Sequence, residues 1–226
     1  MKQFDVIIIG AGIGGLTCGC YLTKAGMRVL IIEQNDKVGG CCVSFVKDGV
    51  KFDAAVHSLG SCREGGLLGT ILRELDLMEN ANLNKQDPVS LLISDNHKIQ
   101  IKRDSKGTID SLSDSFPSER SNIRRFFNLI DSFENNSNYY KFYNKYLRQN
   151  FSVLLKTYFK NTGLISLLNT QLLNIGVPFT EASALSAIML FKEFILDGGY
   201  YPKDGMQSFS CVLADNFFKQ GGTLML

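Results

Sequence analysis

The stretch DVIIIGAGIGGL, residues 5–16, decides the fold of this chain. An apolar strand at 6–9 runs directly into glycines at Gly10, Gly12 and Gly15. Gly10 permits the tight turn after the strand, Gly12 lets the backbone approach a pyrophosphate, and Gly15 lets the following helix lie close to the sheet. Because the first turn of that helix has unpaired N–H groups and a partial positive charge, the stretch predicts a phosphate-binding loop.

A second apolar strand ends at Glu33, eighteen residues after Gly15. A carboxylate at that place accepts the ribose hydroxyls of a bound dinucleotide. A glycine-rich turn in some other α/β protein is the alternative, but here the strand, the helix and the acid all stand at the expected distances. The spacing therefore predicts a Rossmann-like βαβ unit over residues 4–33, which fits NAD and FAD equally well.

The composition argues against several classes of function. The chain has 226 residues, of which 45% are hydrophobic and 20% charged, and its net charge is +2. It can bury a globular core, but it has no basic excess that would indicate nucleic acid as a partner. The apolar stretch near the amino terminus is too short for a signal peptide, and no apolar run reaches about eighteen residues, so we expect no spanning helix.

The six cysteines form no CxxC pairs and no disulfide-like framework. We therefore expect reduced thiols in a cytoplasmic protein, with a redox or metal-binding role as the alternative. Since the chain contains two histidines, we expect no metal site of the zinc type.

Turn signals and hydrophobic spacing predict the remaining elements. Asp48-Gly49 is a strong hairpin signal because both residues adopt positive φ readily. Pro117 is typical of the first turn of a helix. The predicted elements are a β-hairpin at 43–53, a helix at 65–77, a second hairpin around 95–97, a helix from 117 to about 130, a linker at 135–138, a helix at 206–220 and a strand at 223–226.

Several further motifs carry a resemblance to a known family. They are GAGIGGL (10–16), IIEQNDKVGGCC (31–42), GVKFDAAVHSLGS (49–61) and GGYYPKDGMQSF (198–209). On these motifs the chain resembles the flavin amine oxidase superfamily, and within it the branch of phytoene desaturases, carotenoid isomerases and retinol saturases. The likeness covers residues 4–78 and 198–226, and between them only the order of elements matches.

The resemblance implies FAD as the cofactor and assigns its contacts. Glu33 would hold the adenosine ribose, Lys37 would lie near the phosphates or ribose, and Asp53 and His57 would lie toward the flavin end. Two plainer interpretations stay open: Asp53 caps a turn, and His57 packs at a strand-to-loop junction. The cofactor-binding residues implied are Gly10, Gly12, Ile13, Gly14, Gly15, Glu33, Gln34, Lys37, Gly39, Gly40, Asp53 and His57.

The resemblance also implies a function: an FAD-dependent oxidoreductase or isomerase that acts on a long apolar polyene of the carotenoid or retinoid type. No catalytic residue is assigned. Ala55 stands where the family often has Gly, Asp204 interrupts the usual Gly-Gly-Met, and Cys41 stands where amine oxidases tend to carry Arg. The alternatives are an amine-oxidase-type flavoprotein that acts on an amine, and an inactive fragment with residual nucleotide binding.

We therefore expect an α/β fold with two domains. A Rossmann-like FAD-binding domain of the ββα three-layer sandwich type would comprise residues 1–70 and 198–226, and a mostly helical substrate or membrane-facing domain would be inserted at 71–197. A dinucleotide-binding sheet needs more parallel strands than those predicted here. We expect the chain to be the amino-terminal part of a longer protein, with a missing carboxyl-terminal half as its partner.

The inserted domain is rich in aromatic residues interleaved with cations. Aromatic residues at helical spacing are usually core. Amphipathic helices with Lys and Arg on the opposite face also fit a lipophilic substrate and peripheral contact with a membrane. Both interpretations stay open for the stretch that contains Tyr139, Tyr140, Phe142, Tyr143, Tyr146, Phe151, Tyr158 and Phe159, with Lys141, Lys145, Arg148, Lys156 and Lys160.

Overall fold

A computed structural model describes residues 3–133 and 139–226. The chain divides into two compact units, and we describe each by itself. The first unit contains the chain up to Lys85 together with Tyr200–Leu226, and the second contains Gln86–Gly199. The linker predicted at 135–138 lies outside the described residues.

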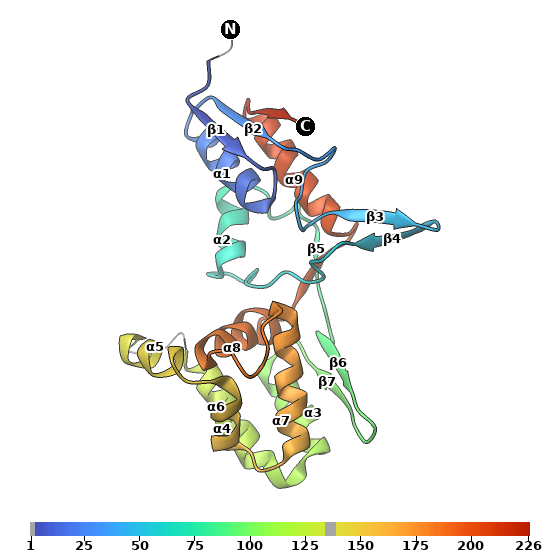
Figure 1. The fold of residues 1–226 in the computed structure, drawn as a ribbon, viewed down its shortest axis with the longest axis vertical. Coiled ribbons are helices and arrows are strands. Elements are labelled where there is room, and N and C mark those ends of the chain that lie inside the picture. The colour runs from blue at the N-terminus through green and yellow to red at the C-terminus, as the bar shows by residue number, and fades with distance from the viewer. Residues whose placement is uncertain (1–2, 134–138) are drawn as a thin grey trace. The chain divides into compact units, whose positions relative to one another are not determined.

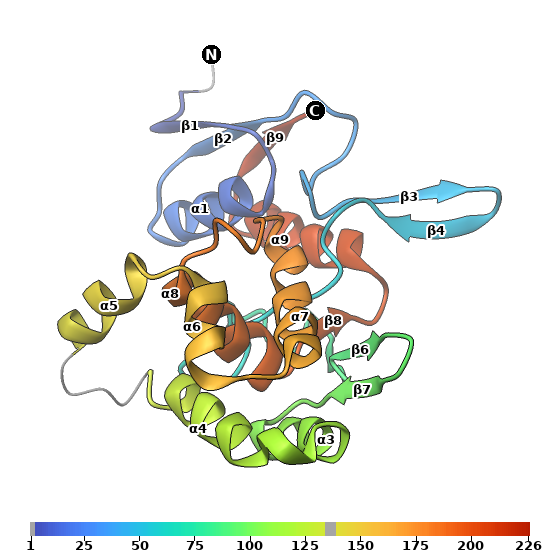
Figure 2. The same ribbon diagram turned by 60° about the horizontal axis from the view of Figure 1, so that its bottom comes forward.

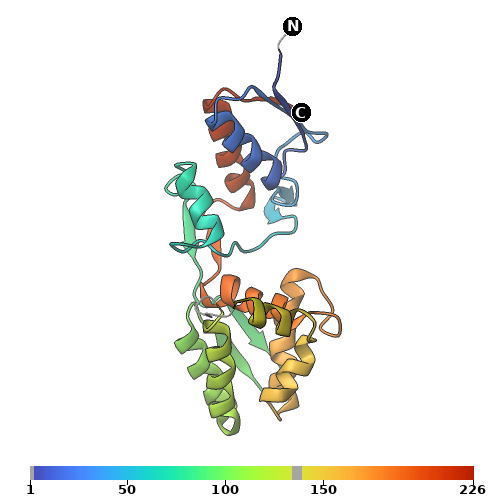
Figure 3. The ribbon, with the colours of Figure 1, turned by 90° about the vertical axis from the view of Figure 1, so that its left-hand side faces the viewer.

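The first unit is built on a parallel sheet (Figure 1). Strands β1 (Val6–Ile9), β2 (Val29–Ile32) and β9 (Thr223–Met225) lie in the order β1-β2-β9, with β2 parallel to both neighbours. Helices α1 (Ile13–Lys24) and α9 (Met206–Lys219) run side by side along this sheet (Figure 3). The predicted βαβ unit is confirmed, and so are the helix and strand predicted near the end of the chain.

One face of this sheet packs against the two helices. Leu16 of α1, Ile31 of β2, and Phe209 and Phe217 of α9 are buried in a common core. Burial of such side chains contributes roughly 1.5–3 kcal/mol each. This core therefore fixes the parallel arrangement on which the glycine turn depends.

Within the described residues of the first unit, no element covers the other face of the sheet, and several of its apolar side chains are exposed. Ile7, Ile9 and Met225 are exposed by 57%, 80% and 56%. Their neighbours in sequence point into the helix-covered core, as the alternation of side chains along a strand requires.

The first hairpin and the following helix form where the sequence predicts them. Strands β3 (Ser44–Lys47) and β4 (Val50–Asp53) pair antiparallel, and the turn residues Asp48 and Gly49 have φ angles of 53° and 77°. Two consecutive positive φ angles are the geometry that the Asp-Gly pair favours. Helix α2 (Leu67–Glu74) confirms the next prediction.

The first unit also contains a pairing that the sequence does not predict. Strand β5 (Leu83–Lys85) pairs antiparallel with β8 (Tyr200–Pro202). Strands of three residues have too little pattern of their own to be recognised. They form here because partners more than a hundred residues apart are brought together by the fold.

The second unit is mostly helical, with one hairpin (Figure 2). Its large aromatic side chains, among them Phe126, Phe127, Phe151 and Phe191, are fully buried and meet edge to face or at a tilt. Within the aromatic stretch at 139–159, Phe142, Tyr146, Phe151 and Phe159 are buried, so the core interpretation holds for these four side chains. The elements are β6 (Ser90–Ile93), β7 (Lys98–Ile101), α3 (Ser105–Ser115), η1 (Pro117–Glu119), α4 (Arg120–Asp131), α5 (Tyr139–Leu147), α6 (Phe151–Tyr158), α7 (Thr162–Thr170), η2 (Gln171–Ile175), α8 (Ala184–Leu190) and η3 (Phe191–Leu196).

The hairpin β6–β7 and the helical start at Pro117 confirm two further predictions. Helix α3 was not predicted, because its sequence SKGTIDSLSDS has little apolar spacing. The side chain of Asp104 accepts a hydrogen bond from the Gly107 N–H and caps this helix. Across the described residues, no helix is long and apolar enough to cross a membrane.

Candidate functional site

The glycine turn between β1 and α1 is shaped by close backbone approach. Gly10 has a φ of 97°, and its N–H donates to the Ile32 carbonyl at 2.7 Å. A Cβ at Gly15 would lie 2.1 Å from the Gly10 carbonyl oxygen, and one at Gly19 would lie 2.8 Å from Ile31 Cδ1. At Gly15 a side chain would clash with the backbone, so this glycine sets the distance between α1 and the turn; at Gly19 the side chains of Ile31 and Phe217 would have to shift.

The amino end of α1 is open toward a ligand. Gly12 occupies the N-cap position, and no side chain among the described residues caps the helix there. A Cβ built on Gly14 would have no heavy atom within 4 Å. The first N–H groups of a helix are unpaired within it. An uncapped helix start with open space above it is therefore a site that a phosphate group fits.

A second glycine loop lies directly beside the first. The Gly39 N–H donates to the Ala11 carbonyl at 2.8 Å, and Gly12 and Gly39 form a parallel bridge. A Cβ on Gly40 would lie 3.2 Å from the Gly12 Cα. The structure therefore brings together two glycine segments that are separated by a helix and a strand in the sequence.

Glu33 joins these loops at the end of β2. Its Oε2 accepts the Ala11 N–H at 2.7 Å, and its Oε1 accepts the backbone N–H and the side-chain amide of Asn35 at 2.9 and 2.7 Å. These hydrogen bonds, first those from the Asn35 and Ala11 backbone, hold the pKa of the Glu33 carboxyl below its usual range. The side chain is thus an anion at neutral pH, placed next to the glycine turn.

The amino-terminal half of α9 holds the second loop in place. Gln207 Nε2 donates to the Val38 carbonyl at 2.9 Å, and Ser210 Oγ donates to the Cys42 carbonyl at 2.8 Å. At Gly39, which has a φ of 125°, a Cβ would lie 2.8 Å from Ser210 Oγ. Gln207 was missed as a site residue, although it lies in the GGYYPKDGMQSF motif, and so was Ser210 directly after it.

Asp53, the last residue of β4, contacts the beginning of α9. Its carboxylate accepts Ser44 Oγ at 2.6 Å, the Met206 N–H at 3.1 Å and the Tyr201 hydroxyl. Burial would raise the pKa of Asp53, but the hydrogen bonds from Ser44 and Tyr201 outweigh it, so the pKa lies below its usual range. The hydrogen bond to Asp53 raises the pKa of Tyr201 to about 12.

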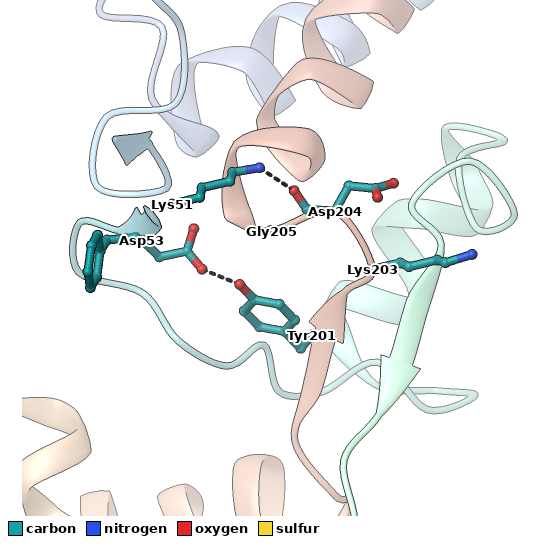
Figure 4. Close-up of a pocket in the computed structure, with 7 residues that line it drawn as sticks. Lys51, Asp53, Tyr201, Lys203, Asp204 and Gly205 are labelled. Atoms are coloured by element: carbon teal, nitrogen blue, oxygen red, sulfur yellow. Dashed lines mark hydrogen bonds between the residues drawn. The ribbon is translucent and has the colours of Figure 1, made fainter. Parts of the chain in front are cut away.

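Asp53 and Tyr201 line a pocket of about 380 Å³ (Figure 4). Lys51 Nζ donates to the Asp204 carbonyl at 2.6 Å across its upper side. The lining residues are Lys51, Phe52, Asp53, Tyr201, Lys203, Asp204 and Gly205.

The other predicted site residues are Lys37, Ile13, Gln34 and His57. Lys37 Nζ donates to the Ser44 carbonyl at 2.5 Å, so its charge is directed toward the hairpin. Ile13 is the first residue of α1, while Gln34 and His57 are exposed. Within the described residues, no group of three or more His, Cys, Asp or Glu side chains is placed to hold a metal ion.

The strand, glycine turn, helix and acid together define a Rossmann-like dinucleotide-binding fold. Residues 8–75 match the NAD(P)-binding Rossmann-like domain family. The fold class predicted from the sequence is thereby confirmed, and the coarse nature of the cofactor, a nucleotide or flavin, with it.

Comparison with known proteins identifies relatives in one branch. The chain is 35% identical over 133 residues to human all-trans-retinol 13,14-reductase, covering 57% of this chain and 22% of that protein. It is 27% identical over 249 residues to prolycopene isomerase 2 of an Oncidium hybrid cultivar, covering 99% of this chain and 42% of the relative. The resemblance to the branch of retinol reductases and carotenoid isomerases is therefore confirmed.

A solved structure of a putrescine oxidase shares the fold, with a TM-score of 0.64 and 20% identity over 98% of this chain and 50% of that one. The chain thus spans less than half the length of the relatives it matches in sequence, and half of this structure.

Proposed function

We propose that this chain binds FAD and contributes to an oxidoreductase or isomerase reaction on a long apolar polyene of the retinoid or carotenoid type. The observation that carries the proposal is the meeting of Gly12, Gly39 and Glu33 at one open helix end. The similarity to a retinol reductase and a prolycopene isomerase supports the polyene as substrate.

The two loops would bind the pyrophosphate through their backbones. The turn from Gly10 through Gly12, Ile13, Gly14 and Gly15 supplies unpaired N–H groups and no bulk. Gly39 and Gly40 would border the same space by backbone, with Lys37 and Gln34 from the intervening segment nearby. A bound flavin supplies hydride or electron transfer, while the chain binds and orients both partners.

Glu33 has fewer unoccupied acceptor positions for the ribose hydroxyls than its sequence position alone suggests. A carboxylate offers about four acceptor positions, and three are taken by Ala11 and Asn35. One ribose hydroxyl can therefore be accepted directly. The second requires the Asn35 side-chain amide to leave Oε1, which makes Asn35 a further candidate contact at the adenosine end.

At the flavin end, we propose a positioning role for Asp53. Its carboxylate is occupied by Ser44, Tyr201 and the amino end of α9, so it fixes the hairpin to the helix. His57 is exposed beyond it and stays a candidate for contact with the flavin.

The remaining assignments are proposals of the same kind. The second unit would form the substrate domain, since its helices combine a large aromatic core with exposed aromatic side chains such as Tyr140 and Tyr143. The amine-oxidase alternative is less well supported, because the likeness to amine oxidases rests on the fold and Cys41 replaces the Arg typical of them.

The decisive experiment compares FAD binding by the wild-type and Gly12→Val chains. Binding is measured by the quenching of flavin fluorescence. A Cβ on Gly12 would meet nothing closer than the Gly40 Cα at 4.0 Å. We therefore expect the variant to fold but to lose FAD, because the valine fills the space of the pyrophosphate. Ala25→Val, at the opposite end of α1, is the matched control and should bind like wild type.

Two results would contradict the proposal. Equal FAD affinity of Gly12→Val and wild type would show that the loop is only a structural turn. Tighter binding of NAD than of FAD would overturn the flavin assignment. If the FAD-loaded chain leaves retinoids and carotenoids unchanged, the inactive-fragment alternative is favoured.

A further inference from the structure

Helix α5 of the second unit (Figure 2) has an amphipathic distribution of side chains. Phe142 and Tyr146 are buried in the core, whereas Tyr140, Tyr143 and Leu147 are exposed by 81%, 37% and 41%. At about 100° per residue, the three exposed side chains fall within about 60° of one another, next to the buried pair. The helix therefore presents an apolar strip beside the face that anchors it.

Cations flank this strip on the other side of the helix. Lys141, Lys145 and Arg148 are exposed and also fall within about 60° of one another. Lys145 Nζ lies 4.8 Å from the ring centroid of Tyr146. An apolar strip with aromatic residues, bordered by long cationic side chains, is the pattern of a helix that lies in a membrane interface.

In the sequence around α5, all charged side chains are cationic. The chain has 24 Lys and Arg residues and 22 Asp and Glu residues, but between residues 135 and 180 there are five of the former and none of the latter. All of these cations are exposed: Lys141, Lys145, Arg148, Lys156 and Lys160. A partner must therefore be anionic, and the apolar strip requires that it also offer an apolar phase. Anionic lipid meets both demands, while a soluble polyanion meets only the first.

We propose that α5 docks the second unit on an anionic membrane surface. Tyr140, Tyr143 and Leu147 lie at the boundary of the acyl chains, and the cations of the helix contact the headgroup phosphates. The inference deepens the proposed function, because a polyene substrate dissolves in such a membrane. Binding of the membrane itself requires no flavin, so the two proposals can fail separately.

The test uses the 226-residue chain, which contains no tryptophan. A Tyr140→Trp variant therefore carries a single fluorescent reporter on the strip. On titration with vesicles of phosphatidylserine and phosphatidylcholine, we expect a blue shift of its emission, and little or no shift with phosphatidylcholine alone. Phe218→Trp, on α9 of the first unit and 49% exposed, is the control reporter and should not shift.

Removal of charge tests the electrostatic part. In the Tyr140→Trp background, Lys141→Gln/Lys145→Gln/Arg148→Gln should lower the affinity for the anionic vesicles about fivefold per cation, on the order of a hundredfold in total. The matched control, Lys98→Gln/Lys106→Gln/Arg124→Gln, removes the same number of exposed cations from β7, α3 and α4 and should bind within about twofold of the parent.

Two outcomes would overturn the proposal. An equal loss from both triple variants would show attraction by net charge rather than by α5. Binding of the anionic vesicles without a blue shift of the tryptophan, abolished by a soluble polyanion such as heparin, would assign the surface to a polyanion. Flavin binding measured on the same variants reports on the proposed function independently.

Discussion

Replacement of Glu33 by Gln tests whether one carboxylate both holds the loops together and binds the cofactor. The carboxylate accepts three hydrogen bonds, from the Ala11 N–H and from two donors of Asn35. A glutamine amide has one oxygen, so its NH₂ must face a donor at one of these places. Losing a hydrogen bond to a charged group costs about 1.5–3 kcal/mol, and we expect the free energy of unfolding of the first unit to fall by that amount.

The loss can be measured by urea unfolding with fluorescence of a Phe218→Trp reporter on α9, which follows the first unit alone. Glu79→Gln, at an exposed carboxylate of the same unit, is the control and should change the free energy by less than about 0.5 kcal/mol. For FAD, the missing ribose contact should weaken binding by roughly 10- to 150-fold.

The pH dependence supplies a second check. Because the pKa of Glu33 is lowered in the folded chain, its contribution to stability is present above about pH 4.5 and is lost as the pH falls through the lowered pKa. The difference between wild type and Glu33→Gln should therefore be constant near neutrality and shrink in acid. A variant as stable as wild type at neutral pH would refute the account of Glu33 as the residue that joins the loops.

Three further outcomes are expected. Gly15→Ala should destabilise the first unit by about 3 kcal/mol or more, because its Cβ meets a backbone oxygen at 2.1 Å, whereas Gly14→Ala meets nothing within 4 Å and should raise the free energy of unfolding by up to about 1 kcal/mol; equal unfolding midpoints of the two variants would contradict this. Tyr201→Phe should lower the free energy of unfolding by about 1–3 kcal/mol, because it removes a donor to Asp53. Since the pKa of Tyr201 is raised to about 12, this contribution should be complete below about pH 10 and lost as the pH approaches 12. Spectrophotometric titration of the tyrosine follows that loss. Glu119→Gln should destabilise the second unit by about 1.5–3 kcal/mol, because this buried carboxylate accepts two backbone N–H groups just before α7; an unchanged thermal midpoint would show that another contact holds that turn.

Much of the first unit could be predicted because its signals are local. The glycine spacing after 6–9, the acid at Glu33 and the Asp48-Gly49 turn are properties of contiguous residues, and each fixes the backbone over one or two elements. The structure confirms all of the elements predicted from them. The cofactor contacts assigned to individual residues remain predictions.

The site also contains features that no local pattern carries. Helix α9 holds the loop at Gly39 through Ser210, although that serine lies about 170 residues further along the chain. Tyr201 likewise reaches Asp53 from a distant strand. Side-chain partners of this kind follow from how elements pack, which spacing within one segment does not specify.

By itself, the sequence determined that a βαβ nucleotide fold begins the chain, because glycines with positive φ or close contacts leave few other conformations for residues 4–33. Only the tertiary structure decided that β9 lies beside β2, that β5 pairs with β8, and that the Ala11 N–H donates to Glu33. Short strands and polar side chains find their partners through packing of distant segments, and the energy of that packing is not encoded in any one stretch of the chain.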